Sequence, residues 1–265
     1  MKADFTYNFL KRNFSLKDKS IVVIGGGGHI CGALSKGLAA AGATIAVLDI
    51  RLEKANNIVK YLKSNYPGNH IALQNDASIK ESHKNCLDLI IKNFSKIDVL
   101  INGAGINSPT PFLEIEFDDW NKVINSQLTA TMFGCQVFGE QMVNQKKGSI
   151  INISSASAGP PLSKAFAYSV AKAGIKNLTM NLAREWALEG VRVNCIRPGF
   201  FPTEWNQKNF ITPERENAIL SHTPMKRFGN PDELIGAAIW LASNSSSFVT
   251  GSEINIDGGF SCMTI

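Results

Sequence analysis

Short apolar runs alternate with longer amphipathic stretches along most of this chain. The runs are rich in β-branched residues and end at Gly, Pro, Asn or Asp, which is typical of buried strands. They fall at residues 20–24, 43–49, 70–75, 97–101, 148–153, 191–196 and 252–257. Stretches with helical periodicity begin at residue 29 and lie at 52–66, 80–94, 118–145, 165–189 and 231–243. This alternation predicts an α/β protein with a doubly wound parallel sheet of about seven strands and helices on both faces.

Two segments stand outside this pattern. Residues 1–15 show no clear periodicity and are expected to form an N-terminal arm. Residues 16–265 are expected to form one domain, because single α/β domains commonly reach this size. Within that domain, the polar and irregular stretch 204–229 is interpreted as a lid-like insertion that closes over a substrate.

Charge and cysteine usage exclude several classes of function. The net charge is +5, but residues 1–20 hold five basic against two acidic residues, so the remaining body is nearly neutral and no nucleic-acid partner is expected. No apolar run reaches the roughly 18 residues of a membrane span, so we expect no membrane partner and a cytoplasmic location. The 5 cysteines show no C-x-x-C spacing, so neither a disulfide framework nor a metal site is expected.

Four consecutive glycines follow the first apolar run. Gly25 to Gly28 allow a tight turn and a close approach of the backbone to a ligand, and the next helix begins at His29 and Ile30. The amino end of a helix attracts phosphate. We therefore expect a dinucleotide phosphate site at Gly25, Gly28, His29 and Ile30.

An acidic residue ends the second apolar run. Asp49 lies about 20 residues beyond the glycines, where a carboxylate takes the ribose hydroxyls of an adenosine and repels a 2′-phosphate. This position favours NAD as the cofactor over NADP. Arg51 is also expected at the cofactor, where it would stack on adenine or admit a phosphate.

Other candidate cofactor residues follow the ends of later strands. The carboxyl ends of parallel strands share one edge of the sheet. A dinucleotide that lies along that edge would therefore contact the residues that follow each strand. The expected residues are Asp76, Ala77, Asn102, Ala104, Gly105, Pro198, Gly199, Phe201 and Thr203.

A tyrosine and a lysine spaced four residues apart carry the candidate chemistry. Tyr168 and Lys172 would share one face of a helix, and Ser155 follows the end of the fifth strand. An ammonium nearby favours the phenolate, so Lys172 would make Tyr168 a usable acid or base. Ser155 would stabilise the oxygen of a reacting carbonyl or carbinol. This trio suits carbonyl–alcohol interconversion, although a lone Tyr-x-x-x-Lys pair is common on solvated helices.

Taken together, these motifs resemble the short-chain dehydrogenase/reductase family over about residues 16 to 260. The resemblance rests on Asp49, Asp76, Asn102–Gly105, Ser155, Tyr168, Lys172, the stretch from Pro198 to Thr203 and Asp257–Gly259. It implies a Rossmann fold, reversible hydride transfer with a nicotinamide cofactor, and homo-oligomers, tetramers or dimers, built partly from the two long helices. It also implies that Tyr168 is the acid/base, that Lys172 binds the nicotinamide ribose, and that both touch the cofactor.

Two departures from the family pattern stand out. The glycine loop Thr-Gly-x-x-x-Gly-x-Gly lacks its threonine here, and His29 and Cys31 replace two of its glycines. Gln127 replaces the catalytic asparagine of the long helix and is expected to hold a water by its amide. Asn125 would point to another face of that helix.

Within the family, residues 25–32, 48–55, 101–105, 198–201 and 222–229 are most similar to the D-mannonate oxidoreductase (fructuronate reductase) branch. That similarity implies a keto sugar acid as the substrate. The candidate substrate residues are Asn107, Lys164, Arg197 and Trp205, of which Lys164 and Arg197 would pair a carboxylate. Arg197 would equally serve to brace a turn.

Two other functions remain open from the sequence. Phe200, Phe201 and Trp205 would also line a pocket for an uncharged or cyclic ketone. The altered glycine loop and Gln127 are also compatible with a non-catalytic dinucleotide-binding protein.

Overall fold

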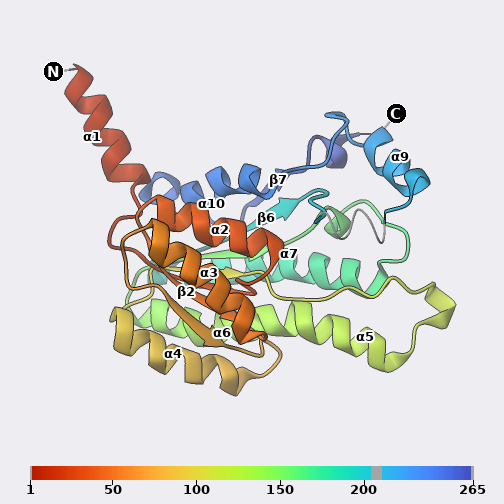
Figure 1. The fold of residues 1–265 in the computed structure, drawn as a ribbon, viewed down its shortest axis with the longest axis horizontal. Coiled ribbons are helices and arrows are strands. Elements are labelled where there is room, and N and C mark those ends of the chain that lie inside the picture. The colour runs from red at the N-terminus through yellow and green to blue at the C-terminus, as the bar shows by residue number, and fades with distance from the viewer. Residues whose placement is uncertain (1, 204–210, 264–265) are drawn as a thin grey trace.

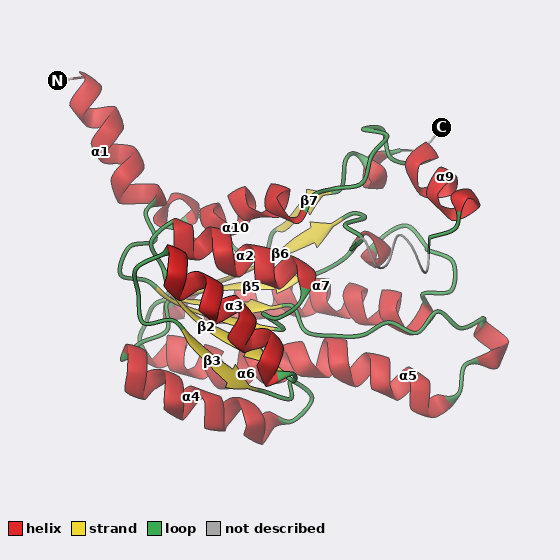
Figure 2. Ribbon diagram, viewed as in Figure 1, coloured by secondary structure: helices red, strands yellow, loops and turns green. Residues whose placement is uncertain are grey.

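A seven-stranded sheet forms the centre of the molecule (Figure 2). The computed structural model describes residues 2–203 and 211–263. Every pair of neighbouring strands in the order β3-β2-β1-β4-β5-β6-β7 is parallel, which confirms the predicted doubly wound sheet. The strands are β1 Ser20–Ile24, β2 Thr44–Asp49, β3 Ile71–Gln74, β4 Val99–Asn102, β5 Gly148–Ile153, β6 Val191–Pro198 and β7 Glu253–Ile256.

Helices cover both faces of this sheet (Figure 1). One core contains apolar residues of α2 His29–Ala40, α3 Leu52–Asn65 and α10 Ile235–Ala242. The other contains residues of α4 Lys80–Phe94, α6 Ala130–Asn144 and α7 Phe166–Trp186. Because β1 and the central strands are buried on both faces, they read as continuous apolar runs in the sequence.

The long helix expected over residues 118–145 is interrupted. It consists of α5 Phe117–Ile124, a π turn over Asn125–Thr129 and then α6. Such π turns are rare inside helices and occur often at functional sites. Gln127 lies in the middle of this turn.

The expected arm is helical over nearly its whole length. Helix α1 Lys2–Phe14 extends away from the body in Figure 1, and Leu16, which follows it, is completely buried. Helical periodicity was not visible in residues 1–15, because the exposed face of α1 carries apolar residues such as Phe9 and Leu10. Helix α9 Pro213–Ser221 lies within the expected lid, whose residues 204–210 are outside the described part of the chain.

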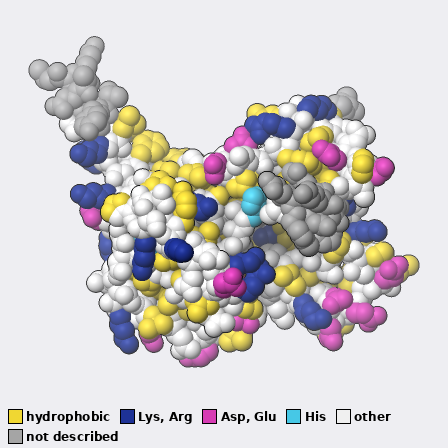
Figure 3. Space-filling view, viewed as in Figure 1, with side chains coloured by type: hydrophobic (Ala, Val, Ile, Leu, Met, Phe, Trp, Pro, Cys, Tyr) yellow, Lys and Arg dark blue, Asp and Glu magenta, His cyan; other side chains and the backbone are white. Residues whose placement is uncertain are grey.

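Surface charge is mixed. On the face shown in Figure 3, basic and acidic side chains are interspersed with apolar ones. Among the described residues, no helix combines the length and the apolar character that crossing a membrane requires.

Candidate active site

The four glycines form a tight loop between β1 and α2. Gly25 has φ +74°, and a Cβ there would lie 2.8 Å from the Cα of Ala104. Gly28 is the N-cap of α2, whose first turn holds no acidic residue. His29 and Ile30 are the first two residues of this helix, and Ile30 packs on the core. A glycine cradle at the amino end of a helix suits a phosphate group, so the loop fits the diphosphate of a dinucleotide.

Asp49 lies at the carboxyl end of β2 and supports this loop. One carboxylate oxygen accepts a hydrogen bond from the Gly27 backbone N at 3.0 Å, and the other accepts one from the Arg51 N at 3.0 Å. A Cβ at Gly27 would lie 2.8 Å from the Asp49 carboxylate. Each oxygen retains a second lone pair, so the carboxylate can hold the loop and still accept from ribose hydroxyls.

Cys31 stands where the family pattern has a glycine. Its thiol is buried against Gly103, at which an added Cβ would lie 2.2 Å from the Cys31 sulfur. Burial raises the pKa of this thiol to about 12, although Lys172 acts in the opposite direction. Cys31 is therefore a neutral packing group between the glycine loop and the end of β4.

Asn102 and Asp76 each form hydrogen bonds with neighbouring groups of the protein. The Asn102 amide donates to Asn152 Oδ1 at 2.8 Å, while its Oδ1 is buried without a hydrogen-bond partner among the described residues. Asp76 Oδ1 accepts from the Ser78 N at 2.9 Å, and Ala77 beside it is buried. Both polar residues lie at the carboxyl edge of the sheet, as predicted.

The segment after β6 lies at the same edge. Pro198 is the last residue of β6, and the Gly199 N donates to the Ile256 carbonyl at 2.9 Å. The Phe201 ring lies against Gly229, where a Cβ would be 2.3 Å from it. Thr203 is partly exposed and is the last described residue before the gap at 204–210.

Ser155, Tyr168 and Lys172 lie together beyond the end of β5. The Ser155 hydroxyl lies close enough to the Tyr168 phenol to act on its pKa. The Lys172 ammonium lies 5.5 Å from the centroid of the Tyr168 ring and donates to the Ile153 carbonyl at 2.7 Å. Helix α7 therefore presents the phenol and the ammonium to the hydroxyl that follows β5, as the spacing predicts.

Burial shifts the pKa values of Tyr168 and Lys172. Burial raises the pKa of Tyr168, and the nearby Ser155 hydroxyl partly offsets that rise. Burial lowers the pKa of Lys172 to about 8, against the influence of the Cys31 and Cys195 thiols. The Tyr168 pKa is raised overall because desolvation of the phenol outweighs the effect of Ser155, and the expectation that Lys172 lowers it stays a prediction.

The side-chain amide of Gln127 forms a hydrogen bond with the backbone. Its Nε2 donates to the Ile106 carbonyl at 2.9 Å, and its Oε1 is buried with no partner among the described residues. Gly105 has φ +147°, and a Cβ there would lie 2.2 Å from the Gln127 Cδ. The Nε2 group therefore fixes the loop after β4, while the expectation that the amide holds a water stays a prediction, for which the unpaired Oε1 is available. Asn125 is exposed, which agrees with the expectation that it points elsewhere.

The candidate substrate residues are not all available to a ligand. Asn107 and Lys164 are exposed, whereas Trp205 lies outside the described residues. Arg197 is only 5% exposed, forms an ion pair with Glu253 at 3.3 Å and donates to the Ala156 carbonyl at 2.9 Å. Its assignment to the substrate is therefore corrected: its charge is already paired, and it braces the turn that follows Ser155.

Sequence reasoning missed the group that holds Arg197. Glu253 also pairs with Lys176 at 3.0 Å and accepts a hydrogen bond from Ser154 at 3.2 Å. It therefore connects β7, α7 and the loop that carries Ser155. An acidic residue at the start of a half-buried strand was the available signal, but its partners are distant in sequence.

Comparison with known proteins agrees with this geometry. A family model described as enoyl-(acyl carrier protein) reductase matches residues 28–261. The uncharacterized oxidoreductase UxuB of Bacillus subtilis is 37% identical over 93% of this chain and 96% of its own length. The 5-keto-D-gluconate 5-reductase of Escherichia coli is 36% identical over 93% of this chain and 96% of its own length.

A solved structure extends the comparison to three dimensions. The crystal structure of a gluconate 5-dehydrogenase from Burkholderia cenocepacia, in complex with NADP and tartrate, has a TM-score of 0.89. It is 30% identical in sequence, and the match covers 95% of this chain and 98% of that one. This chain therefore belongs to the short-chain dehydrogenase/reductase family of oxidoreductases, enzymes that act on CH–OH groups.

Proposed function

We propose that this enzyme uses NAD(H) to interconvert a secondary alcohol and a ketone on a sugar acid or polyol. The observation that carries this proposal is the position of the Lys172 ammonium, which lies 5.5 Å from the centroid of the Tyr168 ring and donates to the Ile153 carbonyl, with the Ser155 hydroxyl near the phenol. A phenol, a hydroxyl and a buried cation at the carboxyl edge of a parallel sheet form an acid–base site beside a dinucleotide crevice.

In the reducing direction, Tyr168 donates its proton to the carbonyl oxygen of the substrate. Ser155 donates a hydrogen bond to the same oxygen and stabilises the charge that develops there. Lys172, oriented by the Ile153 carbonyl, offsets the negative charge left on the tyrosine. A nicotinamide held at this edge of the sheet would supply the hydride for the carbonyl carbon.

For the cofactor, we propose a preference for NAD(H) over NADP(H). Support comes from Asp49, whose carboxylate ends β2 beside the glycine loop and would repel a 2′-phosphate. The gluconate 5-dehydrogenase structure contains NADP, an observation that favours the opposite cofactor preference. The test compares kcat/KM for NADH and NADPH in the wild type and in Asp49→Ser. We expect the wild type to favour NADH and the variant to shift at least tenfold toward NADPH; a wild type that favours NADPH would refute this preference.

For the substrate, we propose a keto sugar acid, with fructuronate as the first candidate and 5-keto-gluconate as the second. The similarity to a 5-keto-D-gluconate 5-reductase supports this class. Two aromatic residues of the apolar-ketone alternative are described: the Phe200 ring centroid lies 5.2 Å from that of Phe260, and Phe201 packs on Gly229. Both also line a cavity, so the apolar-ketone alternative keeps structural support. Asn107 and Lys164 remain exposed for hydroxyl and carboxylate groups.

NADH oxidation over a panel of substrates tests this proposal. The panel contains fructuronate, 5-keto-gluconate, matched uncharged ketoses and cyclic ketones. Turnover of a keto acid at least tenfold faster than the uncharged ketoses supports the sugar-acid substrate. Preference for a cyclic ketone would reject it, and tight NADH binding without any turnover would favour the dinucleotide-binding alternative.

We also propose that the enzyme is a homo-oligomer, assembled through α5 and α7. Large apolar side chains are exposed near these helices, and the Phe112 ring contacts the Phe166 ring at 5.1 Å. Phe117, at the start of α5, is 74% exposed. Adjoining apolar side chains of this kind mark interaction surfaces.

A further inference from the structure

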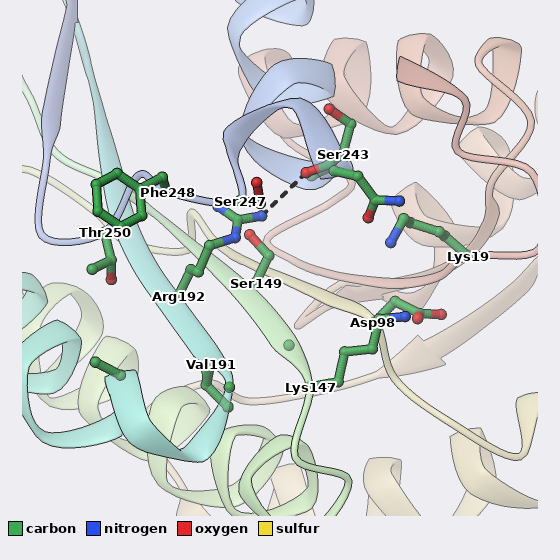
Figure 4. Close-up of a pocket in the computed structure, with 15 residues that line it drawn as sticks. Lys19, Asp98, Lys147, Ser149, Val191, Arg192, Ser243, Ser247, Phe248 and Thr250 are labelled. Atoms are coloured by element: carbon green, nitrogen blue, oxygen red, sulfur yellow. Dashed lines mark hydrogen bonds between the residues drawn. The ribbon is translucent and has the colours of Figure 1, made fainter. Parts of the chain in front are cut away.

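A cavity lies at the opposite edge of the sheet from the candidate active site. It has a volume of about 480 Å³ and lies where β1, β4, β5 and β6 begin. Figure 4 shows side chains from separate elements around it, among them Lys19, Lys147 and Arg192. Because β5 spans six residues between the two edges, the cavity lies on the order of 20 Å from Ser155.

The cavity collects positive charge that the protein leaves largely uncompensated. None of the ion pairs formed within residues 2–203 and 211–263 involves Lys19, Lys147 or Arg192. The carboxylate in the lining belongs to Asp98, and its Oδ2 accepts from the Ser20 N at 2.9 Å and from the Lys96 ammonium at 2.9 Å. Three cations therefore face one carboxylate that already has an ion-pair partner.

The arginine is held rigidly in place. Arg192 donates to the carbonyls of Leu241 at 2.8 Å, Ser243 at 3.3 Å and Val249 at 3.3 Å. These bonds satisfy donors but bring no negative charge. A fixed guanidinium is a preorganised partner for an oxyanion, since it loses little side-chain freedom on binding.

Lys19 responds to this concentration of charge. The pKa of Lys19 is lowered, first by burial and further by Lys147, Lys96 and Arg192, although Asp98 acts to raise it. An anion in the cavity would favour the charged form of Lys19 and relieve this repulsion. The two lysines approach from loops before β1 and β5, so an anion between them would be shared by separate elements.

We propose that this cavity is a binding site for a small phosphate monoester, of the size of a sugar phosphate, distinct from the cofactor crevice. Its volume lies within the range of small-molecule sites. Two lysines and a fixed arginine match the charge of a phosphate dianion. Polar groups in the lining, such as Ser247 and Asn244, can meet sugar hydroxyls, and the fully exposed Phe248 ring offers an apolar face at the rim.

Calorimetric titration of the full chain with glucose 6-phosphate, inorganic phosphate and gluconate tests this site. Each ligand is titrated at constant ionic strength against a chloride control. The test variant is Lys19→Gln/Lys147→Gln, which removes two cations that contact solvent and leaves Arg192 in place. The matched control is Lys84→Gln/Lys122→Gln, which removes two exposed lysines from α4 and α5.

We expect the wild type and the control variant to bind the phosphate ligands and the test variant to bind them at least tenfold more weakly, with all three proteins melting alike. Glucose 6-phosphate binding more tightly than inorganic phosphate identifies a site for the whole monoester. Equal loss of phosphate binding in both variants, or equal binding of the phosphate ligands by the wild type and the test variant, would overturn the proposal. None of these outcomes depends on turnover or on the sugar-acid substrate.

Discussion

Tyr168 joins two groups that bear on its proton, the Ser155 hydroxyl and the Lys172 ammonium. We expect Tyr168→Phe to lower kcat by about 10²–10⁴-fold, because the variant loses the proton donor and keeps the ring. NADH binding, followed by fluorescence titration, should stay within about twofold. The control is Tyr61→Phe on the exposed face of α3, which should keep full activity. Normal turnover by the Tyr168 variant would exclude the proposed acid–base role.

Lys172 should leave a signature in the dependence of stability on pH. Its pKa is about 8 in the folded protein against 10.5 for an ordinary lysine, so the unfolded chain binds more protons between these values. The contribution of this group to the free energy of unfolding therefore rises with pH across that window. Relative to Lys172→Met, the wild type should gain about 2 kcal/mol between pH 7 and pH 10.

Chemical denaturation of both proteins at several pH values measures this difference. Lys84→Met, on the exposed surface of α4, is the control and should show no such trend. A constant difference between wild type and Lys172→Met over the whole range would mean that Lys172 is not desolvated in the folded protein.

The residue types of the acid–base site could be predicted from the sequence, but their partners could not. Helical spacing alone places Tyr168 and Lys172 on one face of α7. The acceptors that hold Lys172 and Gln127 are backbone carbonyls, those of Ile153 and Ile106, and no residue type reveals them. The ion pair that neutralises Arg197 likewise could not be predicted, because its partner Glu253 lies 56 residues away in the sequence.

At the scale of elements, the π turn and the loop after β4 interlock through Gln127 and Gly105. We expect Gly105→Ala to cost about 1–3 kcal/mol of unfolding free energy, because its Cβ would overlap the glutamine side chain. Adding Gln127→Ala should recover part of that loss, leaving the strain of the positive φ. Urea unfolding of the wild type, both single variants and the double variant measures the coupling. Strictly additive effects would contradict the interlock.

The turn that carries Ser155 depends on a charged group in β7. Glu253→Gln leaves Arg197 buried without its carboxylate, which should cost about 3 kcal/mol. Because Arg197 also binds the Ala156 carbonyl, kcat should fall as well, with a smaller effect on KM for NADH. Glu81→Gln breaks an exposed pair with Lys84 and should cost less than about 1 kcal/mol. Equal effects of the two substitutions would refute the bracing role.

The periodicity of the sequence predicted the strands of the sheet and the helices that cover it, but it did not predict the π turn. Asn125–Thr129 contains neither Gly nor Pro, so the sequence shows no break in the helix. A single residue of extra winding changes hydrogen bonding without changing the apolar pattern enough to be seen. The sheet was predictable because its strands are buried on both faces and leave little ambiguity in type.

For the whole molecule, the exposed apolar side chains near α5 and α7 predict an assembly. We expect the wild type to run as a dimer or tetramer in size-exclusion chromatography with light scattering. Phe112→Ser/Phe117→Ser should shift it toward the monomer at equal concentration, because the variant lacks the two apolar rings that a second subunit would cover. Leu188→Ser, which changes a residue 97% exposed elsewhere on the surface, should leave the assembly unchanged. A monomeric wild type would exclude this proposal.

The contact between Cys31 and Gly103 also bears on how this chain can diverge. The sulfur fills the space that any side chain at position 103 would need, so larger residues are tolerated there only after position 31 becomes small. Restoring the family glycine at 31 alone would leave a void over Gly103, and enlarging 103 alone would create a clash. Each single step is harmful while the joint change need not be, which is sign epistasis. A library that varies positions 31 and 103 together would therefore reach sequences that single substitutions do not.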